Sequence, residues 1–230
     1  MEVIKRKSAL IIVDVQNDFI SGSLAVPGGE KVVDVCNHLR DRGDFSMVVV
    51  TQDWHPSTHI SFARNAQNFV LADEVDGAAV CEFSTVSFSD PPLDGVSVFP
   101  VHCVADTWGA ELHKDLQVRS SDVTVRKGSH TERESFSAFA DNTQLSETHL
   151  ANTLRHASIT DVFVCGLAYD VCVSWTARDA VRRGFRTFFV EDAAAGVEPG
   201  EMSRMKQELA QLGVRFVQSD EVPGLLAEAA

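Results

Sequence analysis

The sequence predicts an α/β fold: a doubly wound, six-stranded, mainly parallel sheet with helices on both faces, in a single domain over residues 1–230. Short apolar, β-branched runs alternate with segments of helical periodicity along the whole chain. Such runs are typical of parallel strands, because crossover helices bury both faces of the sheet. The 230 residues are 44% hydrophobic and 23% charged, which is ordinary for a globular domain of this size.

Six apolar runs are the expected strands, and they cover residues 9–13, 47–50, 123–125, 162–165, 187–190 and 214–217. Amphipathic segments between them are the expected helices, over residues 30–42, 146–156, 170–184, 200–212 and 225–229. In the first of these, Val32, Cys36 and Leu39 share one stripe. The regular alternation of strand and helix favours a doubly wound domain over separate α and β units.

One segment, from residue 64 to residue 100, interrupts this alternation. It shows little periodicity, and it contains Pro91 and Pro92 among scattered Ser and Gly residues. Long irregular segments inside a compact domain are uncommon and often form lids or active-site walls. We therefore expect an irregular insertion that walls the active site, with a solvated surface insertion as the alternative.

The charge and cysteine content exclude several classes of protein. With 20 Lys and Arg against 33 Asp and Glu, the net charge is −13. An acidic chain repels phosphate groups, so we expect neither a nucleic-acid nor a membrane partner. Five cysteines with no C-x-x-C pair do not suggest a disulfide framework. The absence of a signal-peptide or membrane-spanning pattern favours a cytoplasmic location, and the oligomeric state, a homo-oligomer included, stays open.

Chemically active side chains follow four of the expected strands. Asp14 follows the first, Asp53 and His55 the second, Lys127 the third, and Cys172 the fourth. Ligands of open α/β sheets bind beyond the carboxyl ends of the strands. An acid, an Asp/His pair, a lysine and a cysteine at one edge therefore favour an active site over unrelated capping, solvated and core residues.

Cys172 is the expected nucleophile. Asp170 is predicted to be the N-cap of the next helix, which places Cys172 in its first turn. The helix N-terminus and Lys127 are expected to lower the pKa of the thiol. Asp14 would accept the thiol proton and return it to a leaving group.

Asp53 and His55 are expected to form part of a metal site. Residues i and i+2 of an extended strand end point to the same side. His102, at the end of the long segment, is the expected third ligand, and His59 is an alternative candidate. Asp and His ligands without thiolate suit one divalent transition metal, with zinc favoured and iron or manganese as alternatives. A hydrogen-bonded structural pair is the competing interpretation.

Together these motifs resemble the nicotinamidases, within the isochorismatase-like cysteine hydrolases. The resemblance extends from about residue 9 to about residue 217. It rests on the following stretches: IVDVQNDF (12–19), TQDWHP (51–56), HISF (59–62), PVHC (100–103), KG (127–128), SFSAF (135–139) and VCGLA (164–168), which leads to CV (172–173). No single stretch is specific, but the combination is.

The resemblance implies roles for these residues. The catalytic triad would be Asp14, Lys127 and Cys172, and the metal ligands Asp53, His55 and His102. A cis peptide between Leu167 and Ala168 would turn the Ala168 N–H inward, to form an oxyanion hole with the Cys172 N–H. The expected substrate contacts are Phe19, Phe99 and Tyr169. Phe99 stands where many relatives have Trp, and Glu134 and Phe136 stand where Asp and Tyr are common.

The activity implied by the resemblance is hydrolysis of nicotinamide to nicotinate and ammonia through a cysteine thioester, in NAD salvage. Pyrazinamide should also fit. One alternative is a metal-free isochorismatase-like hydrolase of another small substrate, which would not need three ligands. Another is a phosphoacceptor-like signalling domain, but such domains are about half this length and leave the cysteine unused.

Overall fold

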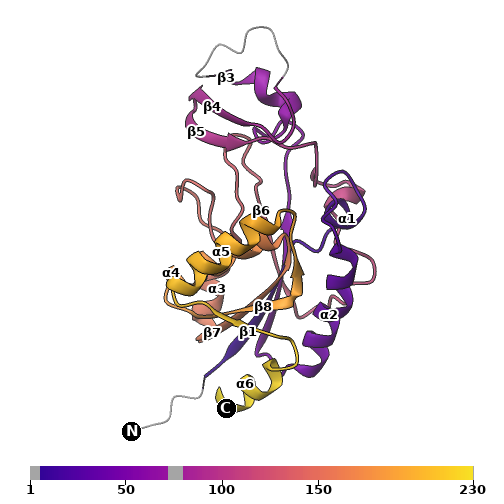
Figure 1. Ribbon diagram of the computed structural model, residues 1–230, viewed down its shortest axis with the longest axis vertical. Coiled ribbons are helices and arrows are strands. Elements are labelled where there is room, and N and C mark those ends of the chain that lie inside the picture. Colours follow the sequence, from indigo (N-terminus) through magenta and orange to yellow (C-terminus); the bar gives the residue numbers. More distant parts are fainter. Residues whose placement is uncertain (1–5, 72–79, 230) are drawn as a thin grey trace.

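The computed structural model describes residues 6–71 and 80–229, and its central feature is the predicted parallel sheet (Figure 1). Six strands lie in the order β6-β2-β1-β7-β8-β9, and every neighbouring pair is parallel. They are β1 (Ser8–Val13), β2 (Met47–Asp53), β6 (Val123–Lys127), β7 (Asp161–Leu167), β8 (Arg186–Ala195) and β9 (Arg215–Val217). Each coincides with a predicted run, so the six-stranded α/β fold is confirmed.

Helices follow the strands, as expected. The longer ones are α2 (Gly29–Arg42), α3 (Leu150–His156), α4 (Ser174–Arg182), α5 (Pro199–Gln211) and α6 (Val222–Ala229). Shorter turns that the sequence pattern did not predict are α1 (Asn17–Ile20), η1 (Ala63–Asn68) and η2 (Trp108–Ala110). The helix expected over residues 170–184 begins with a π-helical turn, η3 (Tyr169–Val173), which leads directly into α4. Among the helices of the described ranges, none combines the length and apolar character needed to cross a bilayer.

The sheet has a hydrophobic layer on each face. Alternate residues of a strand point to opposite faces, so Leu10 and Ile12 of β1 pack with α2 and α6. Ile11 and Val13 face the other way and pack with α3, α4 and α5. This two-sided burial explains why β1 is continuously apolar.

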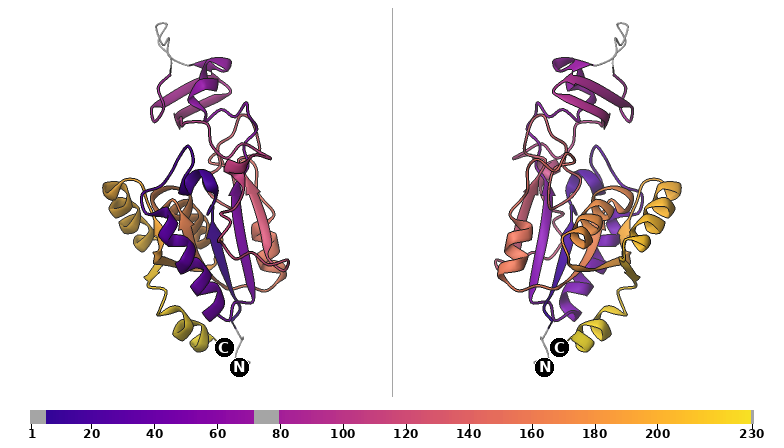
Figure 2. Two further views of the ribbon diagram at one scale, coloured as in Figure 1. Left: turned by 90° about the vertical axis from the view of Figure 1, so that its right-hand side faces the viewer. Right: turned by 90° about the vertical axis from the view of Figure 1, so that its left-hand side faces the viewer.

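The segment over residues 64–100 differs from the prediction of irregular structure. Its described part contains a three-stranded antiparallel sheet, β3 (Val70–Leu71), β4 (Thr85–Asp90) and β5 (Pro92–Ser97), while residues 72–79 lie outside the description. This small sheet projects from one end of the main sheet, away from both termini (Figures 1 and 2). In β4 only Phe88 is buried, so the strand lacks the apolar run that marks a core strand.

A substitution of Phe163, on β7, tests the packing of the hydrophobic layer between the sheet and helices α2 and α6. The ring of Phe163 is buried and stacks on Phe188 of β8, with ring centres 4.4 Å apart. We expect Phe163→Ala to lower the free energy of unfolding by about 3–5 kcal/mol, because the truncation leaves a cavity in the core. Urea denaturation measures this loss. Leu145→Ala, at a side chain that is 74% exposed, should change it by less than about 0.5 kcal/mol. Equal effects of the two substitutions would contradict this description of the core.

Candidate active site

Lys127 lies at the centre of a buried cluster beyond the carboxyl ends of the strands. Its Nζ lies 2.9 Å from Asp14 Oδ2 and forms a second ion pair with Asp53 Oδ1. The ammonium also donates to the Ser135 carbonyl at 2.9 Å and lies 3.5 Å from Cys172 Sγ. Because the register of β2 and β6 pairs Asp53 with Lys127, the sheet itself brings these two residues together.

The ionisation of these groups follows from burial and mutual charge. Burial opposes the charge on Lys127, but Asp14 and Asp53 outweigh it and raise the lysine pKa well above its ordinary value. Burial also opposes the charge on Asp53, but Lys127 and His55 hold the pKa of this carboxyl well below its usual range. At Asp14 burial prevails over Lys127, and the pKa is raised. Asp14 is therefore the carboxyl best suited to exchange a proton.

Cys172 lies in the turn η3, directly before α4. Burial raises the pKa of its thiol well above the ordinary value, opposed by Lys127 and reinforced by Asp14 and Asp53. The predicted lowering of this pKa is therefore wrong, because full burial beside two carboxylates outweighs the lysine. The raised pKa favours the thiol over the thiolate, and the nearby Asp14 carboxyl contributes to this shift.

Asp170 is not the helix cap that the sequence predicted. Ala168 holds the N-cap position of η3, and no side chain caps this turn. The Asp170 carboxylate instead accepts hydrogen bonds from the N–H groups of Val197 at 3.1 Å and Glu198 at 2.8 Å. It therefore ties the turn that carries Cys172 to the loop between β8 and α5. The peptide bond between Leu167 and Ala168, at the start of this turn, is cis.

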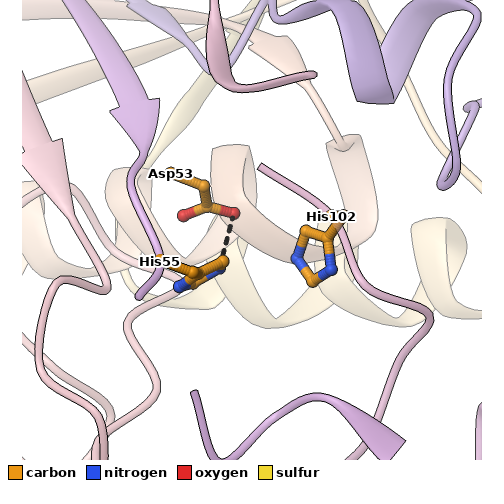
Figure 3. Close-up of side chains that lie close together, drawn as sticks. All are labelled: Asp53, His55 and His102. Atoms are coloured by element: carbon orange, nitrogen blue, oxygen red, sulfur yellow. Dashed lines mark ion pairs between the residues drawn. The ribbon is translucent and has the colours of Figure 1, made fainter. Parts of the chain in front are cut away.

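Asp53, His55 and His102 point toward one another, as Figure 3 shows, and their candidate ligand atoms all lie within 4.8 Å. Nδ1 of His55 lies 2.8 Å from the Gly128 carbonyl, and Nδ1 of His102 lies 2.8 Å from the Pro100 carbonyl. A carbonyl can only accept, so both Nδ1 atoms carry hydrogen and each Nε2 is available to a ligand. Ligating histidines in metal sites are commonly oriented in this way.

The charges of this cluster favour a bound cation. His55 Nε2 is buried without a hydrogen-bond partner, 3.6 Å from Asp53 Oδ2. Burial alone would lower the pKa of His55, but Asp53 outweighs it and the net shift is upward. At His102 burial prevails, and the pKa is lowered. A carboxylate and two oriented imidazoles thus fit a divalent transition metal.

His59, the alternative ligand, has a different place. Its Nδ1 lies 2.7 Å from Ser61 Oγ and its Nε2 lies 3.1 Å from the Arg133 carbonyl, so both nitrogens already have partners. Burial lowers its pKa to about 3. The ring lies against that of His55, with centres 4.1 Å apart, and so supports that ligand.

Two side chains that the sequence reasoning did not assign hold the candidate metal ligands in position. Gln16 Nε2 donates to the Asp53 carbonyl at 2.9 Å, and its Oε1 accepts from the Asp53 N–H at 2.8 Å. Asp18 Oδ2 accepts from the N–H of Cys103, next to His102, at 2.7 Å. The only sequence signal for them was the motif IVDVQNDF, in which each was one residue among several.

Thr51 and Glu134 were also not assigned. Thr51 Oγ1 donates to Asp14 Oδ1 at 2.5 Å, which fixes the carboxyl that faces Cys172. Glu134 is buried, and its Oε1 accepts from the Ser135 N–H at 2.8 Å. Burial opposes its charge, but the nearby His59 and His55 lower its pKa, so a second carboxylate lies near the imidazoles. Glu134 was noted only as a departure from the motif.

A cavity of about 530 Å³ opens onto Cys172, Asp53 and His102. Two of the predicted substrate contacts, Phe19 and Phe99, line it, and their ring centres lie 5.7 and 5.9 Å from that of His102. Glu134 and Phe136 line it as well.

The predicted substrate contact from Tyr169 is corrected. Its ring packs on Phe189, with centres 4.4 Å apart, and its hydroxyl lies 3.3 Å from Glu191 Oε1. The first residue of η3 thus faces the core beside β8. Ala168 and Val171 line the cavity from this turn instead.

The chain is similar to known proteins over almost its whole length. The isochorismatase domain matches residues 8–221. The nicotinamidase of Acinetobacter baylyi is 36% identical over 213 residues, which cover 92% of either chain. A solved nicotinamidase/pyrazinamidase from Acinetobacter baumanii has a TM-score of 0.83 and 37% identity, covering 94% of this chain and 98% of its own. The pyrazinamidase of Pyrococcus horikoshii in complex with zinc has a TM-score of 0.72 and 29% identity, covering 92% and 99%. The chain therefore belongs to the isochorismatase domain family.

Proposed function

We propose that this chain is a nicotinamidase, which hydrolyses nicotinamide to nicotinate and ammonia and so serves NAD salvage. One observation carries the proposal: the buried cluster of Asp14, Lys127 and Cys172 adjoins the candidate metal ligands, and one cavity opens onto Cys172, Asp53 and His102. Relatives named nicotinamidase, similar over nine-tenths of this chain, support it. Pyrazinamide, which has the same carboxamide on a similar ring, would react by the same route.

The thiol of Cys172 is the nucleophile in this reaction. Asp14 takes the thiol proton as Sγ attacks the carboxamide carbon, and the nearby Lys127 ammonium stabilises the developing thiolate. The N–H groups of Ala168 and Cys172 would bind the oxyanion of the tetrahedral intermediate. Asp14 then returns the proton to the leaving nitrogen, and ammonia departs from a Cys172 thioester. Water that Asp14 deprotonates hydrolyses the thioester and releases nicotinate.

Asp53, His55 and His102 would hold one divalent transition metal. Zinc is favoured, which the zinc complex of the Pyrococcus horikoshii pyrazinamidase supports, and iron or manganese suits the same ligands. A metal bound there would supply a Lewis acid that could attract the ring nitrogen of the substrate. The ionised Asp53 and the oriented imidazoles are what this chain contributes to the site.

The aromatic side chains around the cavity would hold the substrate ring. Phe19 and Phe99 lie beside His102, where a pyridine ring would contact their faces. Phe83, from the segment over residues 64–100, also lines the cavity. This placement supports the proposal that the segment walls the active site.

The first prediction tests the nucleophile. Cys172→Ala should reduce ammonia release from nicotinamide by about four orders of magnitude or more, because no other group can form the thioester. Circular dichroism and metal content should be unchanged. Cys103→Ala is the control and should stay active, since its Sγ lies 3.8 Å from the Gly109 carbonyl and the residue does not line the cavity. Turnover by Cys172→Ala near the wild-type rate would exclude covalent catalysis through this residue.

The second prediction concerns the metal. Elemental analysis of the purified protein should find about one divalent transition metal per chain, the content of a single three-ligand site. His102→Ala should lose most of it. His156→Ala, at an exposed histidine on α3, should retain it. A wild-type protein with no metal would favour the metal-free hydrolase of another small substrate.

The third prediction concerns the substrate ring. Benzamide has the carboxamide of nicotinamide but lacks the ring nitrogen, so a site built to bind that nitrogen should reject it strongly. We expect kcat/KM to fall by at least about two orders of magnitude, roughly 3 kcal/mol of transition-state binding. The loss should appear in kcat as well as in KM, because the nitrogen orients the amide. Comparable hydrolysis of both amides would mean that Asp53, His55 and His102 do not select the substrate.

A further inference from the structure

The cavity extends well beyond the groups that would react. Cys172 and His102 are buried at its inner end, whereas Phe83 is 67% exposed and Val197 is 55% exposed at its outer end. A volume of about 530 Å³ is in the range of sites for drug-sized ligands. One pyridine ring with a carboxamide fills only a small part of this volume, so the outer part of the cavity can hold a further group of the ligand.

Phe83 is fixed in an unusual conformation. Its φ is +65°, a region that glycine and asparagine adopt readily and a bulky aromatic residue rarely does. Its N–H donates to the Val98 carbonyl at 2.7 Å, and the Val98 N–H donates to the Ser84 carbonyl at 2.9 Å. The turn itself would favour a smaller residue. A phenylalanine at this position therefore points to a role for the side chain.

The ring of Phe83 continues an aromatic wall that begins at the metal cluster. It meets the Phe99 ring edge to face, with centres 6.3 Å apart. Phe99 in turn lies against His102 on one side and Phe136 on the other, at 5.9 and 6.4 Å. The wall thus runs from a candidate metal ligand to the mouth of the cavity.

Val197 belongs to a different part of the rim, the loop between β8 and α5. Its N–H donates to the two carboxylate oxygens of Asp170, at 3.1 and 3.2 Å. Asp170 lies two residues before Cys172 in the sequence. Leu24, from the loop between α1 and α2, lines the cavity as well. Apolar side chains that are left exposed at one opening mark a binding surface.

The acidic side chains at this mouth are already engaged. Glu198 accepts hydrogen bonds from Gly200 and Glu201 at the start of α5, and Glu201 pairs with Arg204 at 2.7 Å. Their charges are therefore committed to the helix, which favours an apolar ligand group over a cationic one.

We propose that Phe83, Val197 and Leu24 form an apolar subsite that binds an alkyl substituent on the substrate ring. The inference rests on the proposed function. The carboxamide must reach Cys172, and the ring nitrogen lies at the same buried end, so ring carbon 5, remote from both, faces the mouth. The ligands of this subsite are 5-alkyl pyridine-3-carboxamides, whose alkyl chains the apolar rim removes from water.

The test is a series of 5-methyl-, 5-ethyl- and 5-propylnicotinamide, each compared with nicotinamide. In the wild type, kcat/KM relative to nicotinamide should rise about twofold to fourfold per added methylene, as expected for partly to fully buried groups. The gain should appear in KM, because the contact is equal in the ground and transition states. Phe83→Ala should reduce the whole rise to less than about twofold, and Val197→Ser should reduce it independently. Leu145→Ala, exposed but outside the cavity lining, should keep the full rise.

A binding measurement separates this inference from the proposed function. Calorimetric Kd values of the same series on Cys172→Ala do not depend on turnover and should tighten by the same factors. Without nicotinamide hydrolysis by the wild type, the proposed function falls, while the Kd series still decides the subsite. A wild-type series that stays flat or weakens with chain length, or a full rise in Phe83→Ala, would overturn the subsite.

Discussion

The buried ammonium of Lys127 is the charge on which the rest of the site depends. Taking a lysine out of water costs several kcal/mol unless partners compensate it, and two carboxylates side by side repel each other. Here Asp14 and Asp53 both form ion pairs with the Lys127 ammonium. The attraction offsets the desolvation cost of all three groups, and the ammonium reduces the repulsion between the two carboxylates. The pairing of β2 with β6 sets Lys127 opposite Asp53, so these charges meet as the sheet forms.

One lysine beside two carboxylates also separates their roles. Asp53 has additional support from His55, and its pKa falls, so it remains an anion that can face a metal ion. Asp14 lacks such support, burial prevails, and its pKa rises, so it can carry a proton. Similar side chains a few ångströms apart thus acquire different chemistry from their surroundings, as in other enzymes with paired carboxyl groups.

The sequence could predict the features that local pattern encodes. The continuous apolar runs of β1 and β7 are typical of strands that are buried on both faces of a sheet. In a parallel sheet, the residues at the carboxyl ends of the strands meet at one edge. The sequence did not predict β4, because this strand has no continuous apolar run and only Phe88 among its residues is buried. Nor could it predict that Asp170 binds Val197, 27 residues away, or that burial raises the pKa of Cys172, because both depend on tertiary contacts.

The raised pKa of Cys172 determines how the site can work. In the reaction that we propose, a protonated Cys172 thiol would lose its proton as it attacks the substrate, because little thiolate would be present beforehand. The same burial that disfavours the thiolate makes Asp14 a stronger base than a solvated aspartate. Nζ of Lys127 lies 3.5 Å from Cys172 Sγ and 2.9 Å from Asp14 Oδ2. The ammonium therefore stabilises the negative charge whether the thiolate or the carboxylate carries it. Burial thus acts on the donor and the acceptor together, and the lysine between them lets the proton move without leaving an unpaired charge in the core.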